Sequence, residues 1–407
     1  MTAMLSLSQL GTLRNGMNYD RQAVVSGCKI IGVADFGNKV FPDYQTLQEI
    51  DSSIISDDDL LHDGDILFVR SNGNKNLVGR SMFIKDIQES VCYSGFCIML
   101  RPNCDIVLPQ YLFYALRSPF CRKQYSYSQQ TNITNLSQSV LNSVIVPVPS
   151  YENQIKSAKI LYDIDKKIEN NNLVCAELEA MAKTLYDYWF VQYDFPDENG
   201  KPYRASDGEM VWNEQLKREI PKGWTVGKLS DIANITMGQS PAGESYNEMG
   251  EGTIFYQGRT DFGLRFPTPR MYTTAPTRFA KKGDILLSVR APVGDLNIAM
   301  ENCCIGRGLA TLNSKIGSQM HLFYTLSGFK QIFDIMDGNG TTFGSITMDI
   351  LFDMSVVIPT NPPLCEFEKH VKPIETKIQV CEQENRELTK LRDWLLPMLM
   401  NGQARVE

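Results

Sequence analysis

Two long stretches of the chain repeat apolar residues at alternating steps of three and four, the pattern of an amphipathic helix that packs against another helix. The repeating positions, here called the seam, are apolar with three exceptions. In the first stretch they are Leu161, Ile164, Ile168, Asn171, Cys175, Leu178, Ala182, Leu185 and Trp189. In the second they are Val371, Ile374, Ile378, Cys381, Asn385, Leu388, Arg392, Leu395 and Leu399. The spacing within the two stretches is the same from end to end. The matched length and phase favour two helices that pair with each other over two helices that pack on separate domains.

Polar residues interrupt both seams, and prolines mark the second helix. Asn171, Asn385 and Arg392 stand at seam positions, where a polar residue costs stability but fixes the register of a pair. Pro373 falls in the first turn of the second seam and removes a backbone donor, so we expect that helix to begin or kink there. Gly402 follows the last periodic residues and indicates the stop.

Outside the two helices the pattern changes to short apolar runs bounded by turn residues. Four runs predict buried strands: Ile66–Val69, Ile285–Val289, Val144–Val146 and Val356–Ile358. Tyr111–Arg117 and His321–Phe329 carry the helical period. Strands mixed with helices in this way predict an α+β fold.

The chain also repeats itself. Leu10–Asn15 resembles Leu229–Asn234, and Gly64–Leu67 resembles Gly283–Leu286 at the same offset in numbering; Leu112–Leu116 resembles Leu322–Leu326 at a slightly smaller offset, which the two helical seams share. The layout that follows is a domain at 1–149, a long helix at 150–190, a linker at 191–215, a second domain at 216–359 and a second long helix at 360–407. The turn formers of Tyr193–Tyr203 predict a surface connection inside the linker.

Composition narrows the class of protein. At 407 residues, 43% hydrophobic and 21% charged, the chain is long enough for two or three folded domains. Ten irregularly spaced cysteines are too sparse for a disulfide scaffold, and no apolar run reaches about 18 residues, so we expect a cytoplasmic protein without a membrane span. The net charge is −7, but 148–215 alone holds 13 acidic and 7 basic residues, which leaves the two domains nearly neutral.

The usual signs of catalysis are missing from the sequence. Asn361-Pro-Pro-Leu364 lacks the aromatic residue with which amino-methyltransferases stack on a flipped adenine, and we interpret it as a helix start. Asp197, Glu198 and Lys201 lie too close together for a nuclease metal site. There is no phosphate-binding loop, no paired Cys-x-x-Cys spacing and only three histidines. The sequence therefore predicts no catalytic, cofactor or metal site.

Polar and basic residues in loops are the candidates for a binding surface. Arginine recognises guanine edges, asparagine and glutamine recognise adenine, and lysine binds phosphate. Residues of this kind predict a DNA-facing surface at Arg70, Asn72, Lys75, Asn76 and Arg80 in the first domain and at Gln239, Arg259, Thr260, Arg265, Arg290 and Arg307 in the second. Solvated loops have the same composition, and an arginine after a strand, such as Arg70 or Arg290, also pairs with nearby carboxylates.

Several stretches together resemble the specificity subunits of type I restriction-modification enzymes, over the whole chain. They are Pro147-Val-Pro-Ser-Tyr-Glu-Asn-Gln154, Leu185-Tyr-Asp-Tyr-Trp-Phe190 with Tyr193-Asp-Phe-Pro196 and Gly200-Lys-Pro-Tyr203, Ile220-Pro-Lys-Gly-Trp224, Gly238-Gln-Ser-Pro241 and Leu395-Leu-Pro-Met-Leu-Met-Asn-Gly402. The first copy departs from the pattern because it lacks the Pro-Lys-Gly-Trp lead before Leu7. The second helix lacks the Pro-Ser-Tyr-Glu-Asn-Gln entry of the first.

The resemblance implies two target recognition domains held apart by an antiparallel helix pair, which read a bipartite, asymmetric DNA target in double-stranded DNA. It also implies two modification subunits that carry S-adenosylmethionine and methylate adenine and, through them, restriction subunits that use ATP and Mg. The chain itself would be non-catalytic. Two alternatives stay open on the residues: a coiled-coil adaptor whose domains bind proteins, and a chain that methylates or cuts DNA itself.

Overall fold

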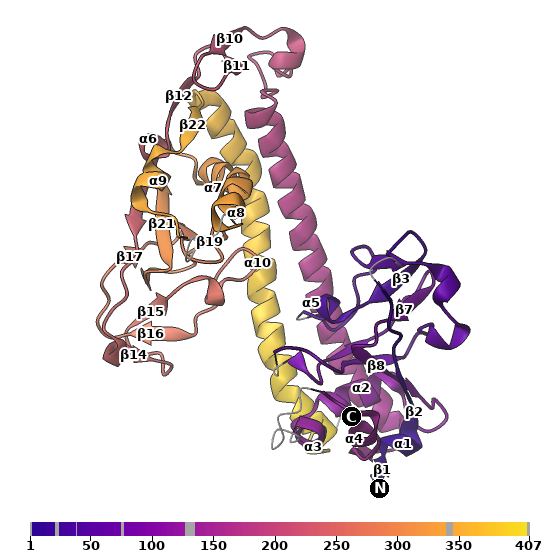
Figure 1. Cartoon of the computed structure of the whole chain (residues 1–407). Helices are drawn as coiled ribbons and strands as arrows, with labels where there is room; N and C mark the ends of the chain where they lie inside the picture. The colour runs from indigo at the N-terminus through magenta and orange to yellow at the C-terminus, as the bar shows by residue number, and fades with distance from the viewer. Residues whose placement is uncertain are drawn as a thin grey trace. The chain divides into compact units, whose positions relative to one another are not determined.

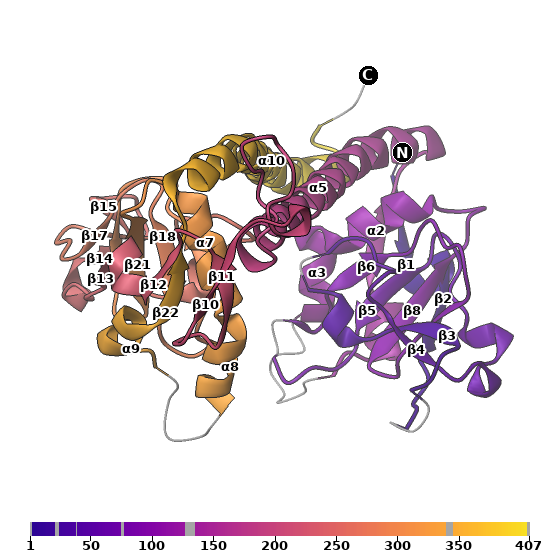
Figure 2. The same ribbon diagram turned by 90° about the horizontal axis from the view of Figure 1, so that it is seen from above.

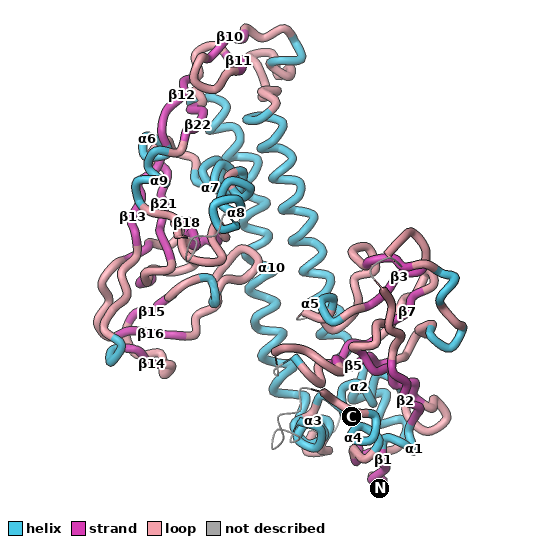
Figure 3. Tube along the Cα trace, in the orientation of Figure 1, coloured by secondary structure: helices cyan, strands magenta, loops and turns pink. Residues whose placement is uncertain are grey.

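The structure, a computed structural model, describes residues 2–20, 24–37, 39–74, 77–126, 135–338 and 345–404. The chain forms two compact units: unit 1 comprises Met1–Asn170 with Asn385–Glu407, and unit 2 comprises Asn171–Glu384. Each unit combines small sheets and short helices with parts of two long helices (Figure 3). None of the helices in the described residues is long and apolar enough to cross a membrane.

Unit 1 is built on a four-stranded sheet of order β2-β8-β5-β6, a three-stranded sheet of order β4-β3-β7 and the pair β1-β9. Its strands are β1 Ala3–Ser6, β2 Gly11–Asn15, β3 Cys28–Ile31, β4 Gln48–Ile50, β5 Ile66–Val69, β6 Ser81–Phe83, β7 Val91–Tyr93, β8 Cys97–Pro102 and β9 Ile145–Val148. Its short helices are α1 Leu7–Leu10, α2 Pro109–Arg117, α3 Pro119–Ser126 and α4 Gln138–Asn142. Every residue of β5 is buried, as its uninterrupted apolar run predicts.

Unit 2 repeats this arrangement with the sheets β13-β21-β18-β19, β14-β16-β15-β20-β17 and β12-β22, and adds the hairpin β10-β11. Its strands are β10 Met210–Asn213, β11 Arg218–Pro221, β12 Thr225–Lys228, β13 Ala233–Met237, β14 Tyr246–Asn247, β15 Thr253–Tyr256, β16 Met271–Thr273, β17 Phe279–Ala280, β18 Ile285–Ser288, β19 Leu296–Ile298, β20 Cys303–Ile305, β21 Leu309–Ser314 and β22 Ser355–Ile358. Its short helices are α6 Leu229–Ile232, α7 Gln319–Gly328, α8 Lys330–Gly338 and α9 Met348–Asp353.

The structure corrects one part of the predicted repeat. Strand β5 matches β18 and helix α2 matches α7, as predicted. At the start of each domain, however, α1 begins at Leu7 and α6 begins at Leu229, so Leu7 rather than Leu10 is the counterpart of Leu229. Pairing Leu10–Asn15 with Leu229–Asn234 was therefore wrong by three positions. The error arose because Leu7 and Leu10 both fit the leucine that opens the short helix.

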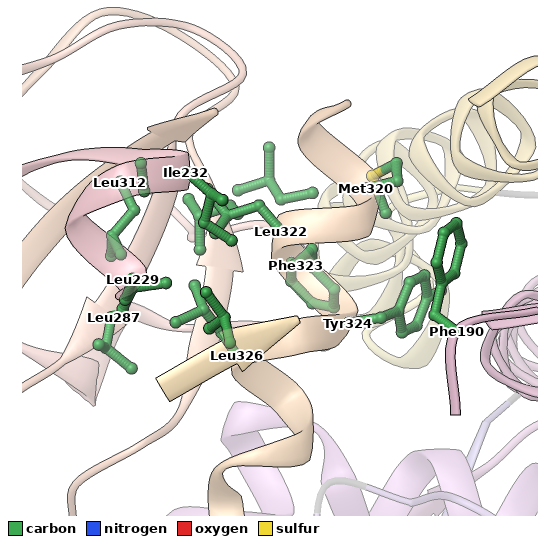
Figure 4. Close-up of a cluster of buried hydrophobic side chains, with 14 of the residues drawn as sticks. Phe190, Leu229, Ile232, Leu287, Leu312, Met320, Leu322, Phe323, Tyr324 and Leu326 are labelled. Carbon is green, nitrogen blue, oxygen red and sulfur yellow. The ribbon is translucent and has the colours of Figure 1, made fainter. Parts of the chain in front are cut away.

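In unit 2, helix α7 lies between the sheet and the long helices (Figure 2). Its side chains alternate between two directions: Leu322 and Leu326 point to the sheet side, whereas Tyr324 points to Phe190 of the helix end (Figure 4). All four belong to one buried cluster. Helix α2 has the same role in unit 1, where the Tyr114 hydroxyl donates to Asp165 of the first long helix over 2.8 Å. One short helix in each unit thus helps to attach the sheets to the long helices.

The long helices are α5, Tyr151–Tyr186, and α10, Asn361–Met400, and they run side by side (Figure 1). Every predicted seam residue is buried or partly buried. In unit 2, Asn171 Nδ2 donates to Glu384 Oε2 over 2.8 Å, and Cys175 Sγ lies 3.9 Å from the Ile378 carbonyl oxygen. The residue number rises along one helix as it falls along the other, so the pair is antiparallel. The paired helices and the α+β class are confirmed.

Two predictions beside the long helices need correction: the second helix does not start at Pro373, and the linker is not confined to the surface. Helix α10 begins at Asn361 and continues through Pro373, which is exposed, so the backbone donor that proline lacks falls on the solvent side of the helix. The segment after α5 is more than a surface connection. Tyr193 and Phe195 are buried, and Phe195 stacks on Trp224 with ring centroids 5.0 Å apart. Turn formers set the path of this segment, but its aromatic side chains pack into unit 2.

Candidate nucleic-acid interface

Three loops of unit 2 meet at one end of its sheets. They are the loop after β13, which carries Gln239, the loop after β15, which carries Gln257, and the turn between β20 and β21, which carries Arg307. Gln239 N donates to the Ile305 carbonyl oxygen over 3.0 Å, and Gly308 N donates to the Gln257 carbonyl oxygen over 3.2 Å. The backbone hydrogen bonds hold the three loops as one surface, which we call the loop junction.

Side chains and a glycine complete the loop junction. Ser240 Oγ accepts hydrogen bonds from Arg307 N over 3.2 Å and from Gln257 Nε2 over 3.1 Å. A Cβ on Gly238 would lie 2.2 Å from the Gly306 carbonyl oxygen, so only glycine allows the first and third loops to approach this closely. Gln239 and Arg307 are exposed on this junction.

Arg259, Thr260 and Arg290 extend the same surface. Arg259 and Thr260 are exposed and directly follow the Gln257 loop in a short 3-10 turn. Arg259 Nη1 lies 2.7 Å from Asp295 Oδ2, and the side chain is 46% exposed. Arg290 is exposed and follows Val289, whose N donates to the Gly308 carbonyl oxygen over 2.9 Å. Five of the six residues predicted in the second domain therefore lie on exposed, adjoining loops.

Arg265 does not lie on this surface, and we withdraw it from the DNA-facing set. It is 1% exposed, and its guanidinium lies over the ring of Phe323, 4.1 Å from the centroid. Its Nη2 is 3.3 Å from Glu179 Oε1 and its Nε is 3.5 Å from Glu375 Oε1, both on the long helices. Burial raises the pKa of Glu375 to about 7, against the opposing effect of Arg265. Sequence alone does not separate an arginine buried against helix carboxylates from one exposed in a loop.

The equivalent loops of unit 1 are joined by equivalent bonds. Met17 N donates to the Tyr93 carbonyl oxygen over 3.2 Å, and Arg70 N donates to the Phe96 carbonyl oxygen over 2.8 Å. A Cβ on Gly16 would lie 2.2 Å from the Ser94 carbonyl oxygen, the same close approach as at Gly238. The loop junction is therefore a property of both domains, although most side chains on it differ.

Of the residues predicted in unit 1, Arg70 lies on this junction. Arg70 is partly buried and its Nη1 donates to the Gly95 carbonyl oxygen over 3.3 Å. Asn72 Oδ1 accepts from Asn74 N over 2.8 Å, which makes a turn, and Arg80 Nη1 donates to the Gly37 carbonyl oxygen. Lys75 and Asn76 lie outside the described residues. Arg70 thus supports the junction with its side chain as well as its backbone.

Sequence reasoning missed Phe96 and Asn18 on the junction of unit 1 and Ser240 and Gln257 on that of unit 2. Phe96 is 60% exposed, although it follows Gly95 in a turn between two buried strands. Phe96 and Asn18 line a pocket of about 860 Å³ together with Met17, Tyr19 and Ser94. The sequence signal that could have identified Phe96 is an aromatic residue in a turn between two strands. Phe96 corresponds to Gly308 in unit 2, so the two domains present different chemistry at one position.

Comparison with known proteins decides the family. The model of the type I restriction modification DNA specificity domain matches residues 20–180 and 221–390. The chain belongs to this family. It is the DNA specificity subunit of a type I restriction-modification system, and the family is non-catalytic. The prediction from the sequence is confirmed, and the two alternatives, an adaptor and a self-sufficient enzyme, are set aside.

Individual relatives match this specificity subunit over most of its length. A protein of Methanocaldococcus jannaschii, provisionally named as the specificity subunit of the type I restriction enzyme MjaX, is 32% identical over 351 residues, which are 84% of this chain and 79% of that protein. The HindI specificity subunit of Haemophilus influenzae is 23% identical over 403 residues and covers 84% and 86%. The crystal structure of a type I specificity subunit from M. genitalium has the same fold, with a TM-score of 0.57, 16% identity and coverage of 98% and 96%.

Proposed function

We propose that the specificity subunit reads a bipartite, asymmetric DNA target, one half-site through each recognition domain, and directs adenine methylation or restriction by its partner subunits. The observation that carries the proposal is the loop junction, which recurs in both domains with equivalent backbone hydrogen bonds after the first two strands, the same close approach at a glycine and different exposed side chains. We take the domains to span 1–149 and 216–359, the long helices 150–190 and 360–407, and the linker 191–215. From its sparse, irregularly spaced cysteines we place the protein in the cytoplasm.

The partners supply the chemistry under this proposal. Two modification subunits would bind S-adenosylmethionine and transfer its methyl group to adenine, and restriction subunits would use ATP and Mg. The specificity subunit would contribute position only. The exposed Gln239, Arg259, Thr260, Arg290 and Arg307 of unit 2 suit hydrogen bonds to base edges and phosphates. In unit 1 we assign this role to Asn72, Lys75, Asn76, Arg80 and, through its support of the junction, Arg70.

The first test is modified-base sequencing of DNA from cells that express the specificity subunit with its modification subunit. We expect N6-methyladenine in a bipartite motif that is absent without this chain. Arg259→Ala with Arg307→Ala should relax one half-site and leave the other unchanged, because a bidentate arginine contributes about 1–3 kcal/mol of discrimination. Lys222→Ala removes an exposed charge from the β11 side of the same unit and serves as the control. Relaxation of both half-sites, or of neither, would contradict the assignment.

A second test asks whether the length of the helix pair sets the distance between the two half-sites. Helix α5 has 36 residues and a length of about 54 Å, enough to set half-sites about one DNA turn apart. A heptad inserted after Cys175 and a second after Ile378, which face each other, would lengthen the pair by about 10 Å. We expect the methylated spacer to grow by about three base pairs, whereas either insertion alone should disrupt assembly. An unchanged spacer with both insertions would show that the helix length does not set the distance between the half-sites.

A further inference from the structure

The end of α5 in unit 2 is closed by a cluster of aromatic side chains. Phe190 lies 5.1 Å from Phe367 of α10 and 5.9 Å from Trp224 between ring centroids. Tyr193 lies 5.5 Å from Trp224 in an edge-on arrangement. With Phe195, these residues are at most 7% exposed. The segment that follows α5 therefore fills the space beside the helix end with its own aromatic side chains.

The same positions of unit 1 carry smaller side chains. When the two copies are aligned on their long helices and on α1 and α6, Met400 replaces Phe190, Ser157 replaces Phe367 and Thr2 replaces Trp224. Leu399 stands where Trp189 stands in unit 2, and Gln403 stands where Tyr193 stands. In the described residues of unit 1, no aromatic segment takes the place of Tyr193–Phe195.

The exchange leaves a groove at the end of α10. It has a volume of about 830 Å³. Its apolar lining comprises Met4, Tyr111, Phe120, Pro147, Leu399 and Met400. Met4 is 53% exposed and Phe120 is 43% exposed. Large apolar side chains gathered beside a groove of this size mark a binding surface.

We propose that this groove, defined by those six residues, binds an extended segment of a modification subunit that carries aromatic side chains. The observation that names the occupant is unit 2, where the equivalent space holds Tyr193, Phe195 and Trp224 of this chain. Those residues are buried in their own unit and do not serve unit 1. The inference rests on the proposed function, because that function supplies the modification subunit.

The rim of the groove adds a charge preference. Lys156 lines it, and its ammonium pairs only at the surface with Glu152, over 3.3 Å. Such an exposed pair is weak and exchanges readily for another acidic partner. In unit 2 the position of Lys156 holds Glu366, and Asp194 accepts from Ala205 N over 2.7 Å, so the charge preference comes from Lys156 alone. The occupant is therefore an aromatic segment with an acidic residue beside its rings. Because the space is filled in unit 2, one such segment binds each specificity subunit.

Photocrosslinking tests the occupant in the assembled complex of the specificity subunit with its modification subunit. With p-benzoylphenylalanine in place of Met4, we expect a crosslink to the modification subunit, mapped by mass spectrometry to a segment with aromatic and acidic residues. The same group at Met249, which is 87% exposed in a loop of unit 2, is the control and should give no such crosslink. Crosslinks only to this chain or to a second copy of it, or no crosslink at position 4, would overturn the proposal.

Filling the groove is the second test. Ser157→Phe with Met400→Phe gives unit 1 two of the aromatic residues of unit 2, and we expect the crosslink to disappear and the affinity for the modification subunit to fall at least tenfold. Ser157→Thr with Met400→Leu is the matched control. Unchanged affinity of the filled variant, with its circular dichroism preserved, would overturn the proposal. Modified-base sequencing distinguishes failure of this inference from failure of the proposed function. A methylated motif without the crosslink contradicts only the proposal for the groove, whereas a missing motif contradicts the proposed function.

Discussion

Asp165 of α5 and Glu375 of α10 occupy the same position of the repeat, and the two units neutralise them differently. In unit 1, Asp165 accepts from the Tyr114 hydroxyl and from Arg392 Nη1, each over 2.8 Å, so the cation comes from the other long helix. In unit 2, Glu375 lies 3.5 Å from Arg265, which comes from the recognition domain. The cation that pairs with the equivalent carboxylate thus comes from the helix pair in unit 1 and from a loop of the recognition domain in unit 2.

The repeat has therefore preserved a buried carboxylate beside a tyrosine, but not the element that supplies the cation paired with that carboxylate. Tyr324 corresponds to Tyr114, and Arg265 Nη2 lies 3.3 Å from its hydroxyl. Removing either cation would leave a buried carboxylate without its counter-charge, which is costly in any fold. The two copies have therefore kept the same energetic requirement while their loops diverged.

The largest effect is expected from Arg265→Met. It leaves Glu375 and Glu179 facing each other without the cation, and the cost of breaking a buried pair is about 3–5 kcal/mol. Urea unfolding followed by tryptophan fluorescence measures it in unit 2, because Trp189, Trp212 and Trp224 lie there and Trp394 lies in unit 1. Lys222→Met, which breaks an exposed and solvent-screened pair with Glu209, should cost far less. Equal costs would show that Arg265 does not stabilise the domain as described.

Glu375→Gln should change the pH dependence of unit 2. Burial raises the pKa of Glu375 above its ordinary value of 4.5 to about 7, while Arg265 opposes the rise and Glu179, Glu382 and Glu368 add to it. The folded state therefore binds the proton more tightly, so the stability due to this group is present below about pH 4.5 and is lost as the pH rises through 7. The loss amounts to at most about 3 kcal/mol. Fluorescence-detected unfolding should show a decline from pH 5 to pH 7.5 in the wild type and a flatter course in the variant.

A double-mutant cycle on Asp165→Asn and Arg392→Gln should give a coupling energy of about 1–3 kcal/mol in unit 1. Both side chains of the pair are buried or nearly so, at 1% and 16% exposed. Hydrogen exchange of the α2 peptide, which Tyr114 ties to Asp165, reports on unit 1 separately. Additive single effects would mean that the two side chains act independently, and the comparison with unit 2 would fail.

The smallest loss of stability is expected at the helix caps that the two copies share, and it should be equal in the two units. Ser137 Oγ accepts from Val140 N, and Thr347 Oγ1 accepts from Ile350 N, at equivalent positions of the repeat. Ser137→Ala and Thr347→Ala should each cost about 1 kcal/mol. Hydrogen exchange of α4 and α9 measures both in one sample. Unequal costs would show that local capping has diverged along with the ion pairs.

Local pattern predicted most of the fold because it reports burial directly. The run of β5 depends on adjacent residues and the seams of α5 and α10 on neighbours three or four positions away, and the structure confirms them. The failures depend on distant partners. Arg265 is buried by carboxylates of both long helices, far from it in sequence, and Phe195 is buried by Trp224. At the candidate interface, loop composition identified exposed residues in unit 2 but not Phe96, whose exposure is set by the packing of β7 and β8.

The division of the chain into units has a consequence for its synthesis. Unit 2 is continuous from Asn171 to Glu384, whereas unit 1 needs Asn385–Glu407 in addition to Met1–Asn170. On the ribosome the first domain emerges early but waits for the last turns of α10, including Arg392, the partner of Asp165. Domains otherwise tend to fold in the order of their synthesis. Here the inserted unit is completed first, and the domain translated first is the last to acquire its full set of contacts.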